Sequence, residues 1–364
     1  MRTISINGRF LTQPLTGVQR FGRELTSALD RRIGAGAVPA PLTGARWRIV
    51  VPHGTTPDIR LDHIAIEEHG SGSGHLWEQT ALGLATRGDL LVGFGGSGPL
   101  LHPHQLVVIH DVTIFRHPES FTRSYRLAHA LLGFVLARRA RLATVSRFSR
   151  DELGAVFRVP TEPIRVIYNA VEHFSALEPD RAAAQRLGLR DGRYFLVLGT
   201  LKPNKNVDFA ISAFQSLARD DLKLVMVGSA HPGVFKSSAI GGSENLVHAG
   251  RLSDAEVAGL ARGATALVFP SLYEGFGIPP LEAMSQSCPV LAADIPPVRE
   301  ACGDAALYFD PHVRETLKDA MRRILDEPAL RADLSAKGRA NAARFSWATS
   351  AGDLLDLIAE META

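Results

Sequence analysis

Two glutamates lie eight positions apart in a stretch rich in glycine and proline, which reads Pro-Ser-Leu-Tyr-Glu-Gly-Phe-Gly-Ile-Pro-Pro-Leu-Glu over residues 270–282. Gly275 and Gly277 let the backbone approach a ligand closely, and the two prolines fit the first turn of a helix. The free N–H groups of that helix suit a diphosphate, whereas Glu274 and Glu282 accept hydrogen bonds from sugar and ribose hydroxyls. The stretch predicts a site for a polyhydroxylated anion. A surface turn with two solvated glutamates is the alternative that spacing alone leaves open.

A second loop carries lysines that suit a diphosphate. It follows the apolar run at residues 194–198 and reads Gly-Thr-Leu-Lys-Pro-Asn-Lys-Asn over residues 199–206. Lys202 or Lys205 would supply the positive charge that a leaving diphosphate requires. A solvated lysine near the start of a helix is the competing interpretation.

The first half of the chain contributes fewer candidates. Gly17 lies after the first apolar run, where the absence of a side chain leaves room for a phosphate or a sugar. His110 and Asp111 directly follow the apolar run at residues 106–109, and ligands of doubly wound sheets bind at the carboxyl ends of the strands. A lone histidine is also common as a structural residue, so both roles stay open for His110.

Several motifs of other enzyme classes are missing from the sequence. No Asp-x-Asp occurs, and the thirteen histidines show no His-Glu-x-x-His spacing, so we expect no metal in diphosphate binding. No Gly-x-Gly-x-x-Gly follows the first apolar run, which removes the main reason to expect a nicotinamide or flavin enzyme.

The scaffold for these residues is predicted from short apolar runs that alternate with helical patterns. Val18, Phe21, Leu25 and Leu29 have the spacing of a crossover helix between two strands. We therefore expect an α/β protein with two Rossmann-like domains, whose parallel sheets face each other across a cleft. The predicted strands cover residues 3–6, 48–51, 90–94, 106–109, 142–145 and 165–168 in the first half, and 194–198, 224–227, 266–269, 289–292 and 306–309 in the second.

The domain boundaries follow from the same pattern. A chain of 364 residues suits two domains of roughly 150 to 200 residues each. We place the first domain at residues 1–171 and the second at 172–344, with a hinge near 170–176. The amphipathic segment at 345–364 is expected to form a helix that packs back across both domains.

Composition excludes several classes of protein. The net charge near +2 argues against a dedicated nucleic-acid binder. Cys288 and Cys302 are the only cysteines, so we expect two core thiols in a reducing compartment rather than a disulfide framework. The N-terminus leads directly into a strand pattern, and no apolar run reaches 18 residues. These features predict a cytoplasmic protein.

One segment has an unusual charge pattern. Residues 116–150 hold eight arginines and one glutamate around the apolar run at 127–137. Such a segment could dock on an anionic membrane surface, where a lipid-linked substrate is found. A packed helix with solvated arginines is the alternative.

The motifs together resemble those of the family 4 retaining glycosyltransferases with the GT-B fold, over nearly the whole chain. The most specific element is the pair Glu274 and Glu282 in the frame EGFGIPPLEAMSQSCPVLAAD. In order and spacing, the chain is similar to bacterial mannosyltransferases of O-antigen and exopolysaccharide assembly. The supporting elements are TGVQRFGREL (16–25), HLWEQ (75–79), IHDVTIFRHPESF (109–121), TVSRFSRDEL (144–153), VIYNAV (166–171), GTLKPNKN (199–206) and AGRLSDAEVAGL (249–260).

This resemblance implies a role for each matching residue. Glu274 would contact hydroxyls of the transferred sugar, and Glu282 would bind the ribose diol. The other implied contacts are the backbone amides of Phe276, Gly277 and Ile278 with sugar and phosphate, Lys205 with the diphosphate, Gly17 with a phosphate, Arg251 and Leu252 with the base, and His110 with the donor sugar.

One position departs from the family pattern. Relatives usually carry an arginine beside the diphosphate lysine or at the start of its loop, where this chain has Asn204 and Thr200. Lys202 is the candidate replacement. A lysine lacks the bidentate fork of arginine, so its contact with a diphosphate would differ in shape.

The resemblance also implies an activity and partners. We expect a metal-independent hexosyltransferase without a cofactor, which uses a nucleotide sugar as co-substrate and a saccharide or polyprenyl-linked saccharide as acceptor. GDP-mannose is the leading donor. A UDP- or dTDP-hexose donor remains an alternative, as does a non-catalytic or epimerase-like protein of the same fold. The expected location is the cytoplasm, including the inner face of the plasma membrane.

Overall fold

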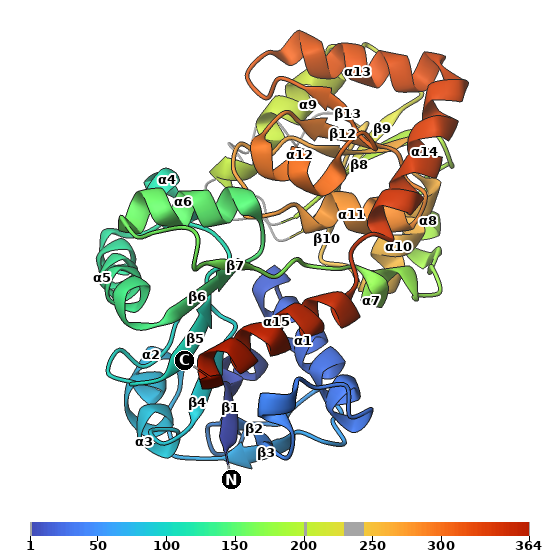
Figure 1. The fold of residues 1–364 in the computed structure, drawn as a ribbon. Coiled ribbons are helices and arrows are strands. Elements are labelled where there is room, and N and C mark those ends of the chain that lie inside the picture. The colour runs from blue at the N-terminus through green and yellow to red at the C-terminus, as the bar shows by residue number, and fades with distance from the viewer. Residues whose placement is uncertain (1, 200–201, 229–243, 364) are drawn as a thin grey trace. The chain divides into compact units, whose positions relative to one another are not determined.

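The computed structural model describes residues 2–199, 202–228 and 244–363 (Figure 1). The chain divides into two compact units. The first combines Met1–Asn169 with Ser346–Ala364, and the second is Ala170–Phe345. Each unit is built on one parallel sheet, so the prediction of two α/β domains with parallel sheets is confirmed.

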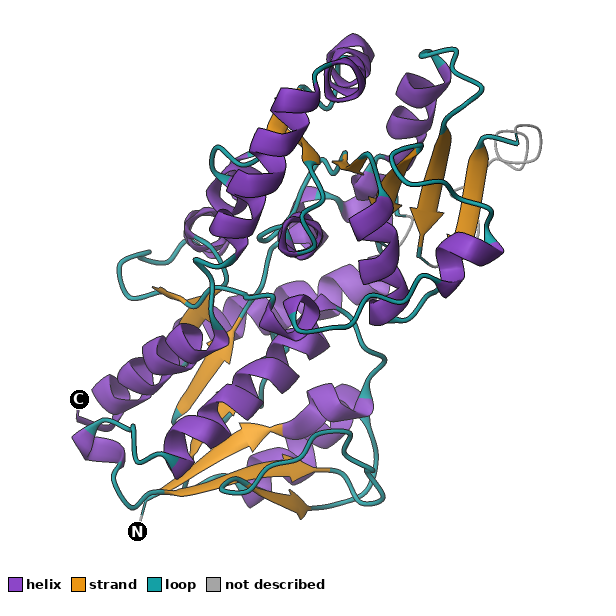
Figure 2. Ribbon diagram, turned by 90° about the vertical axis from the view of Figure 1, so that its right-hand side faces the viewer, coloured by secondary structure: helices purple, strands orange, loops and turns teal. Residues whose placement is uncertain are grey.

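The sheet of the first unit has seven strands among the described residues, in the order β3-β2-β1-β4-β5-β6-β7. Its central strands β1, β4 and β5 are almost wholly buried, as expected for parallel strands covered by helices on both faces (Figure 2). The strands are β1 (Thr3–Asn7), β2 (Arg46–Val51), β3 (Ala65–Glu68), β4 (Leu90–Gly93), β5 (Gln105–Val108), β6 (Arg141–Thr144) and β7 (Arg165–Val166).

Helices connect and cover these strands. The longest are α1, whose apolar stripe packs on the sheet as its spacing predicts, and α5 and α15. The helical elements of the first unit are η1 (Gly8–Thr12), α1 (Gly17–Gly34), η2 (Ala40–Leu42), α2 (Gly74–Trp77), the π-helix η3 (Glu78–Leu82), α3 (Gly83–Ala85), α4 (Thr113–Arg116), η4 (Pro118–Ser120), α5 (Arg123–Arg139), α6 (Arg147–Phe157) and α15 (Trp347–Thr363).

The last helix, α15, belongs to the first unit although it follows the second in sequence. It packs on α1, and the ring of Trp347 meets Phe21 edge to face at 5.7 Å. The Ser350 hydroxyl donates to the carbonyl of Tyr168 at 2.7 Å. The C-terminal segment therefore completes the hydrophobic core of the first unit.

The sheet of the second unit has six strands among the described residues, in the order β10-β9-β8-β11-β12-β13. They are β8 (Tyr194–Leu198), β9 (Lys223–Val227), β10 (Leu246–Gly250), β11 (Ala266–Phe269), β12 (Val290–Ala293) and β13 (Leu307–Phe309). Its helical elements are α7 (Glu172–Ser175), α8 (Ala182–Arg186), η5 (Pro203–Lys205), α9 (Val207–Gln215), α10 (Asp254–Gly263), α11 (Ile278–Ser285), α12 (Pro296–Cys302), α13 (Arg314–Asp326) and α14 (Pro328–Ala342).

Two features of this unit agree with the sequence pattern. Ser253 and Glu256 form the expected capping box at the start of α10, each side chain bonding the other's backbone N–H. Cys288 and Cys302 are free and buried, and burial raises the pKa of each thiol to about 12. The prediction of two core thiols is confirmed.

Both sheets contain a point where the strand order reverses. In the first sheet β1 and β4 are neighbours, with β2 and β3 on one side and β5 to β7 on the other. In the second sheet β8 and β11 occupy the equivalent positions. Open α/β sheets bind ligands outside the carboxyl ends of the strands at such a switch point. Residues that directly follow these four strands are therefore the first to consider for function.

Candidate active site

The predicted residues Lys205 and Glu274 meet at the switch point of the second sheet. Lys205 ends the short helix η5 after β8, and Glu274 follows β11. The lysine Nζ lies 2.5 Å from the glutamate Oε1 and 5.8 Å from the centre of the Phe269 ring. Both side chains are largely buried, with 23% and 14% of their surface exposed. The pair therefore places a cation beside a carboxylate that can accept hydrogen bonds from hydroxyl groups, in one largely buried position.

Backbone bonds hold the two loops of this pair together. The N–H of Leu272 donates to the carbonyl of Asn204 at 2.8 Å, and the Asn204 side-chain amide donates to the carbonyl of Tyr273 at 3.4 Å. Asn204, one position of the departure from the family pattern, is buried, and these two bonds join the loops. Thr200, the other position of that departure, lies outside the described residues.

The turn before α11 has the geometry that its glycines and prolines predict. Gly277 is the N-cap residue with φ of 119°, in a region that favours glycine, and prolines occupy the first turn of the helix. Because proline has no N–H, the amides of Gly277 and Ile278 are the donors that this helix end can offer. The ring of Phe276 is buried against Phe345, at 5.3 Å between centroids, and anchors the turn.

Glu282 lies one turn into α11 and contacts a residue that the sequence analysis did not single out. Its Oε1 is 3.6 Å from Nε2 of His173, whose side chain is 6% exposed. His173 comes from α7, more than one hundred positions away in sequence. The chain separation explains why no local motif pointed to this contact.

The remaining predicted residues of the second unit follow strands of the same sheet edge. Lys202 is the half-buried N-cap residue of η5 after β8. Arg251 and Leu252 follow β10, which lies two strands from β8 and hence about 10 Å to its side. Arg251 is exposed, and Leu252 is half-buried. These positions are all on the carboxyl edge of the sheet.

The two predicted residues of the first unit are Gly17 and His110. Gly17 is the exposed first residue of α1. His110 follows β5, its Nε2 lies 2.8 Å from the carbonyl of Phe94, and its ring packs edge to face on Phe21 at 4.9 Å. Burial lowers the pKa of His110, so the ring is neutral near pH 7 and Nε2 donates to the carbonyl.

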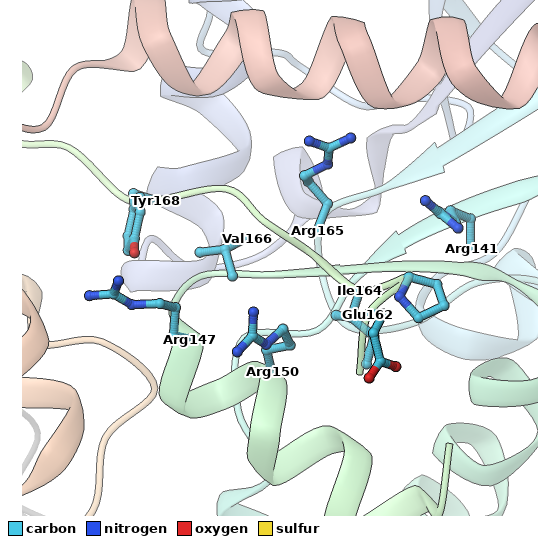
Figure 3. A pocket seen from close by; sticks show the side chains of 9 residues that line it. Arg141, Arg147, Arg150, Glu162, Ile164, Arg165, Val166 and Tyr168 are labelled. Atoms are coloured by element: carbon cyan, nitrogen blue, oxygen red, sulfur yellow. The ribbon is translucent and has the colours of Figure 1, made fainter. Parts of the chain in front are cut away.

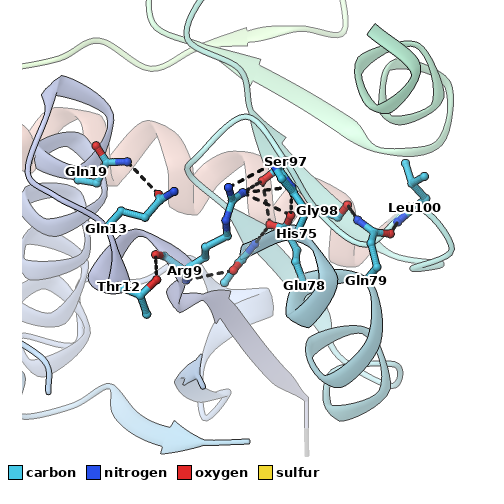
Figure 4. A network of polar contacts seen from close by, with 11 residues as sticks. Arg9, Thr12, Gln13, Gln19, His75, Glu78, Gln79, Ser97, Gly98 and Leu100 are labelled. Carbon is cyan, nitrogen blue, oxygen red and sulfur yellow. Dashed lines mark hydrogen bonds and ion pairs between the residues drawn. The ribbon is translucent and has the colours of Figure 1, made fainter. Parts of the chain in front are cut away.

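A buried polar network at the switch point of the first sheet was not predicted from the sequence (Figure 4). The carboxylate of Glu78, fully buried, accepts hydrogen bonds from Asn7 at 2.6 Å and Ser97 at 2.8 Å. Its other oxygen lies 3.0 Å from His75 Nδ1 and 3.5 Å from Arg9 Nη1. Burial alone would raise the pKa of Glu78, but these hydrogen bonds and the charge of Arg9 outweigh it and lower the pKa.

A hollow of about 490 Å³ at the edge strand β7 of the first unit is lined by four arginines, Arg141, Arg147, Arg150 and Arg165 (Figure 3). Arg141 and Arg165 both form ion pairs with Glu360, and Arg150 pairs with Asp151. Charged side chains along an edge strand prevent pairing with another chain. Three of the four arginines of the hollow have acidic partners within the first unit.

Two other kinds of feature are absent from the described parts of the chain. No group of three His, Cys, Asp or Glu side chains is arranged to hold a metal ion within residues 2–199, 202–228 and 244–363. Over the same residues, no helix is long and apolar enough to cross a bilayer.

Comparison with known proteins defines the class of this protein. The family described as "Glycosyl transferases group 1" matches residues 181–341, which cover the loops of Lys205 and Glu274 and helix α11. A solved structure, the Anabaena protein HepE in complex with UDP and glucose, has the same fold with a TM-score of 0.74 at 17% identity, over 99% of this chain and 100% of that one. The chain carries a glycosyl transferases group 1 domain and is a glycosyltransferase with a GT-B-like fold.

Two curated relatives show which glycosyltransferases this chain is similar to in sequence. The chain is 29% identical over 262 residues to "O-antigen chain mannosyltransferase B" of Escherichia coli, a match that covers 67% of this chain and 68% of that protein. It is 30% identical over 234 residues to "O-antigen chain mannosyltransferase RfbU" of Salmonella typhimurium, which covers 63% of each chain. The protein is thus a homologue of O-antigen mannosyltransferases and spans about two thirds of their length.

Proposed function

We propose that this enzyme transfers mannose from GDP-mannose, with retention of configuration, to a saccharide acceptor in the synthesis of a cell-surface polysaccharide. The ion pair of Lys205 with Glu274, next to the free amides of Gly277 and Ile278, carries the proposal. The names of the two relatives support mannose as the sugar. In this proposal the second unit holds the nucleotide sugar and the first holds the acceptor.

Leaving-group stabilisation is the main catalytic contribution in this proposal. The bond between the sugar C1 and the diphosphate oxygen breaks while the acceptor oxygen bonds to C1 on the same face. The acceptor proton passes to the departing phosphate oxygen. Lys205 and the amides of Gly277 and Ile278 would stabilise the charge that develops on the diphosphate, and Lys202 would add to it. This chemistry requires no metal ion and no cofactor.

The remaining site residues are assigned to the donor. Glu274 accepts hydrogen bonds from sugar hydroxyls, and Glu282 accepts them from the ribose diol. Arg251 and Leu252 line the base. The proposal gives Gly17 a phosphate contact and places the neutral ring of His110 at the donor sugar.

The choice of nucleotide is tested first by a thermal-shift screen with GDP, UDP and dTDP. A ligand present at one hundred times its dissociation constant stabilises the protein by about 2.7 kcal/mol. We expect the largest rise in melting temperature with GDP. A larger rise with UDP would favour a UDP-hexose as the donor. This donor is the first alternative, because the HepE structure with the same fold contains UDP and glucose.

Catalysis is tested with GDP-mannose itself. We expect slow release of GDP and mannose without an acceptor and faster release of GDP with one. Binding of GDP-mannose without any hydrolysis or transfer would favour a non-catalytic protein. Conversion of GDP-mannose to another GDP-sugar would favour an epimerase.

A lipid-linked acceptor is supported by the outer face of α5. Leu127 and Leu131 are 75% and 62% exposed, and Phe134 is 37% exposed on the same side. Arg123 and Arg138 flank them, and α5 contains no acidic residue. Exposed apolar side chains bordered by arginines suit the surface of an anionic bilayer. We therefore place the enzyme at the inner face of the plasma membrane.

Sedimentation with liposomes tests this location. We expect the enzyme to pellet with vesicles that contain phosphatidylglycerol and to remain in solution with phosphatidylcholine vesicles. The double variant Leu127→Asp, Leu131→Asp should stay in solution with both. Val313→Asp, at an exposed apolar residue of the second unit, is the control. Absence of wild-type binding to the anionic vesicles would contradict the membrane location.

A further inference from the structure

The proposed function leaves one substrate, the acceptor, without contact residues. The first sheet has its own switch point between β1 and β4, and Arg9 and Ser97 lie two and four residues after the ends of these strands. The Arg9 Nη1 donates to the Ser97 hydroxyl at 2.7 Å, so the two strand ends are joined where a ligand of this fold is expected.

A buried carboxylate fixes the side chains at this point. Glu78 holds both Arg9 and His75, and the Arg9 Nη2 also lies 3.2 Å from His75 Nε2. Arg9 is 15% exposed, and its Nε is buried without a hydrogen-bond partner among the described residues. His75 is 38% exposed. The network therefore presents a rigid guanidinium and a partly accessible imidazole rather than mobile surface charges.

A column of rings extends from this network along α5. His75 meets His129 edge to face at 5.1 Å, and His129 stacks on Tyr125 at 3.7 Å. Tyr125 in turn stacks on Phe121 at 5.5 Å with nearly parallel planes. Tyr125 is 45% exposed. Phe121 and His129 cover the two faces of Tyr125, so the exposed part of this ring is its edge, which offers an apolar surface to the C–H groups of a sugar.

A hydrogen bond fixes the tautomer of His129 and leaves its second ring nitrogen able to accept a hydrogen bond. Its Nδ1 lies 3.0 Å from the carbonyl of Tyr125, one helical turn earlier. Burial lowers the pKa of His129, so the ring is neutral near pH 7, and Nδ1 must carry the proton that the carbonyl accepts. The Nε2 atom is then an acceptor for a hydroxyl group.

Resting on the proposed function, we propose that Tyr125, His129, His75 and Arg9 form the binding site for the terminal sugar of the acceptor. The C–H groups of the sugar pack against the exposed edge of the Tyr125 ring and against His129. Its hydroxyls donate to His129 Nε2 and accept from the Arg9 guanidinium. Because Glu78 already balances the charge of Arg9, the site selects an uncharged sugar rather than a free phosphate group.

This site is distinct from the face assigned to the membrane. Residues 125 and 129 are one turn apart on one side of α5, and residues 127 and 131 are one turn apart on the opposite side. The Tyr125 side adjoins the network at the sheet edge, through the contact of His129 with His75. One helix can therefore serve the acceptor sugar on one side and the lipid on the other.

Saturation-transfer NMR with methyl α-D-mannopyranoside, methyl α-D-glucopyranoside and methyl α-D-galactopyranoside tests the proposal. We expect at least one glycoside to show saturation of its ring protons with the wild-type protein. Tyr125→Ala and His129→Ala should each reduce this signal at least fivefold, whereas Tyr125→Phe, which keeps the stacking ring, should retain it. Ser124→Ala, an exposed neighbour on α5, is the matched control. Melting temperatures of all variants should stay near that of the wild type.

The possible results separate this proposal from the proposed function. Hydrolysis of GDP-mannose without acceptor depends on the residues assigned to the donor, which do not include Tyr125 or His129, so Tyr125→Ala and His129→Ala should hydrolyse it at the wild-type rate. Loss of glycoside signal with unchanged hydrolysis supports the acceptor site. Unchanged signal in both alanine variants, or no signal with any glycoside in the wild type, overturns it while the donor chemistry stands. A wild type without hydrolysis or transfer contradicts the proposed function itself.

Discussion

At the scale of single residues, Lys205 is the most direct test of the donor site. Its ammonium is assigned to the developing charge of the diphosphate, and loss of one such donor costs about a hundredfold in turnover. We expect Lys205→Ala to lower kcat by about this factor and Lys205→Arg to recover part of it, since arginine keeps the charge. Steady-state kinetics with GDP-mannose measure both.

The control for this variant is Lys337→Ala, which removes a lysine paired with Asp333 on the exposed surface of α14. An exposed pair of this kind contributes little to stability because water and salt screen it, so its loss should leave kcat unchanged. Equal kcat values for Lys205→Ala and the wild type would remove Lys205 from the mechanism.

Glu78 should control the acid stability of the first unit. Its pKa in the folded protein lies below the ordinary value, so its contribution to stability is full above about pH 4.3 and is lost as the pH falls through the lower folded value. Glu78→Gln leaves Arg9 without its charge partner and should destabilise the protein by about 3 kcal/mol at pH 7.

Thermal unfolding at pH 7 and at pH 3.5 checks this expectation. The wild type should lose part of its stability advantage over Glu78→Gln at the lower pH, because the carboxyl group of the unfolded chain takes up a proton there before that of the folded chain does. Asp58→Asn is the control, because that carboxylate also pairs with an arginine, Arg23, but is itself 61% exposed. A difference between wild type and Glu78→Gln that does not change with pH would show that charge is not the cause.

The residues that we assign to the donor carry a local sequence signal, whereas those that we assign to the acceptor do not. Lys205 and Glu274 each stand in a short loop with glycine or proline neighbours, and such loops carry a local signal. Arg9, His75 and His129 have no such signal, because their contacts join segments from the first strand to the fifth helix. Only folding brings these three side chains together.

At the scale of elements, the turn before α11 depends on one backbone conformation. Gly277 has φ of 119°, and the nearest side-chain atom to an added Cβ would be 3.6 Å away, so strain rather than collision opposes a side chain. We expect Gly277→Ala to lower stability by about 1–2 kcal/mol and to weaken GDP binding at least tenfold, as the amides of Gly277 and Ile278 shift.

Gly192→Ala is the matched control for this turn. Gly192 also has a positive φ, of 69°, with open space around an added Cβ, but it precedes β8 at the opposite end of the strand. Its variant should lose stability and keep its GDP affinity in isothermal titration calorimetry. An unchanged affinity in Gly277→Ala would contradict the role of the turn amides.

The two strands that the sequence pattern did not predict, β3 and β10, both lie at the edge of a sheet. β3 (Ala65–Glu68) carries Glu67, whose carboxylate pairs with Arg48 at 2.9 Å across the neighbouring strand. β10 (Leu246–Gly250) is only partly buried. An edge strand needs no continuous apolar run, because one side faces solvent, and so the pattern of buried central strands does not apply to it. The central strands were predicted because their burial requires apolar residues.

At the scale of the whole molecule, the two units repeat one arrangement with different chemistry. Each switch point carries a carboxylate paired with a cation, Glu78 with Arg9 in the first unit and Glu274 with Lys205 in the second. The first pair is fixed further by Asn7 and buried, whereas the second lies beside a helix end that offers amides. We therefore propose that the same topology holds an uncharged sugar in one unit and a diphosphate in the other.

Helix α15 follows the second unit in sequence but packs in the first, so the stability of the first unit depends on the last segment of the sequence. Five large apolar side chains of α15, Trp347, Leu354, Leu355, Leu357 and Ile358, are buried, which is on the order of 10 kcal/mol of apolar burial. That value is comparable to the whole stability of a domain. A chain ending at residue 345 should therefore contain an unfolded first unit and a folded second unit.

Limited proteolysis of this truncated chain tests the expectation. Trypsin should degrade the first unit and leave a resistant fragment close to residues 170–345, and that fragment should still show a GDP-induced rise in melting temperature, because its core and the α11 turn are its own. Glu360→Gln in the full chain is the control, since it removes only the exposed ion pairs with Arg141 and Arg165 and should leave both units resistant. Equal resistance of the first unit to trypsin with and without α15 would mean that the buried face of this helix adds little to the stability of the unit. Degradation of both units in the truncated chain would mean that the second unit cannot fold without the first.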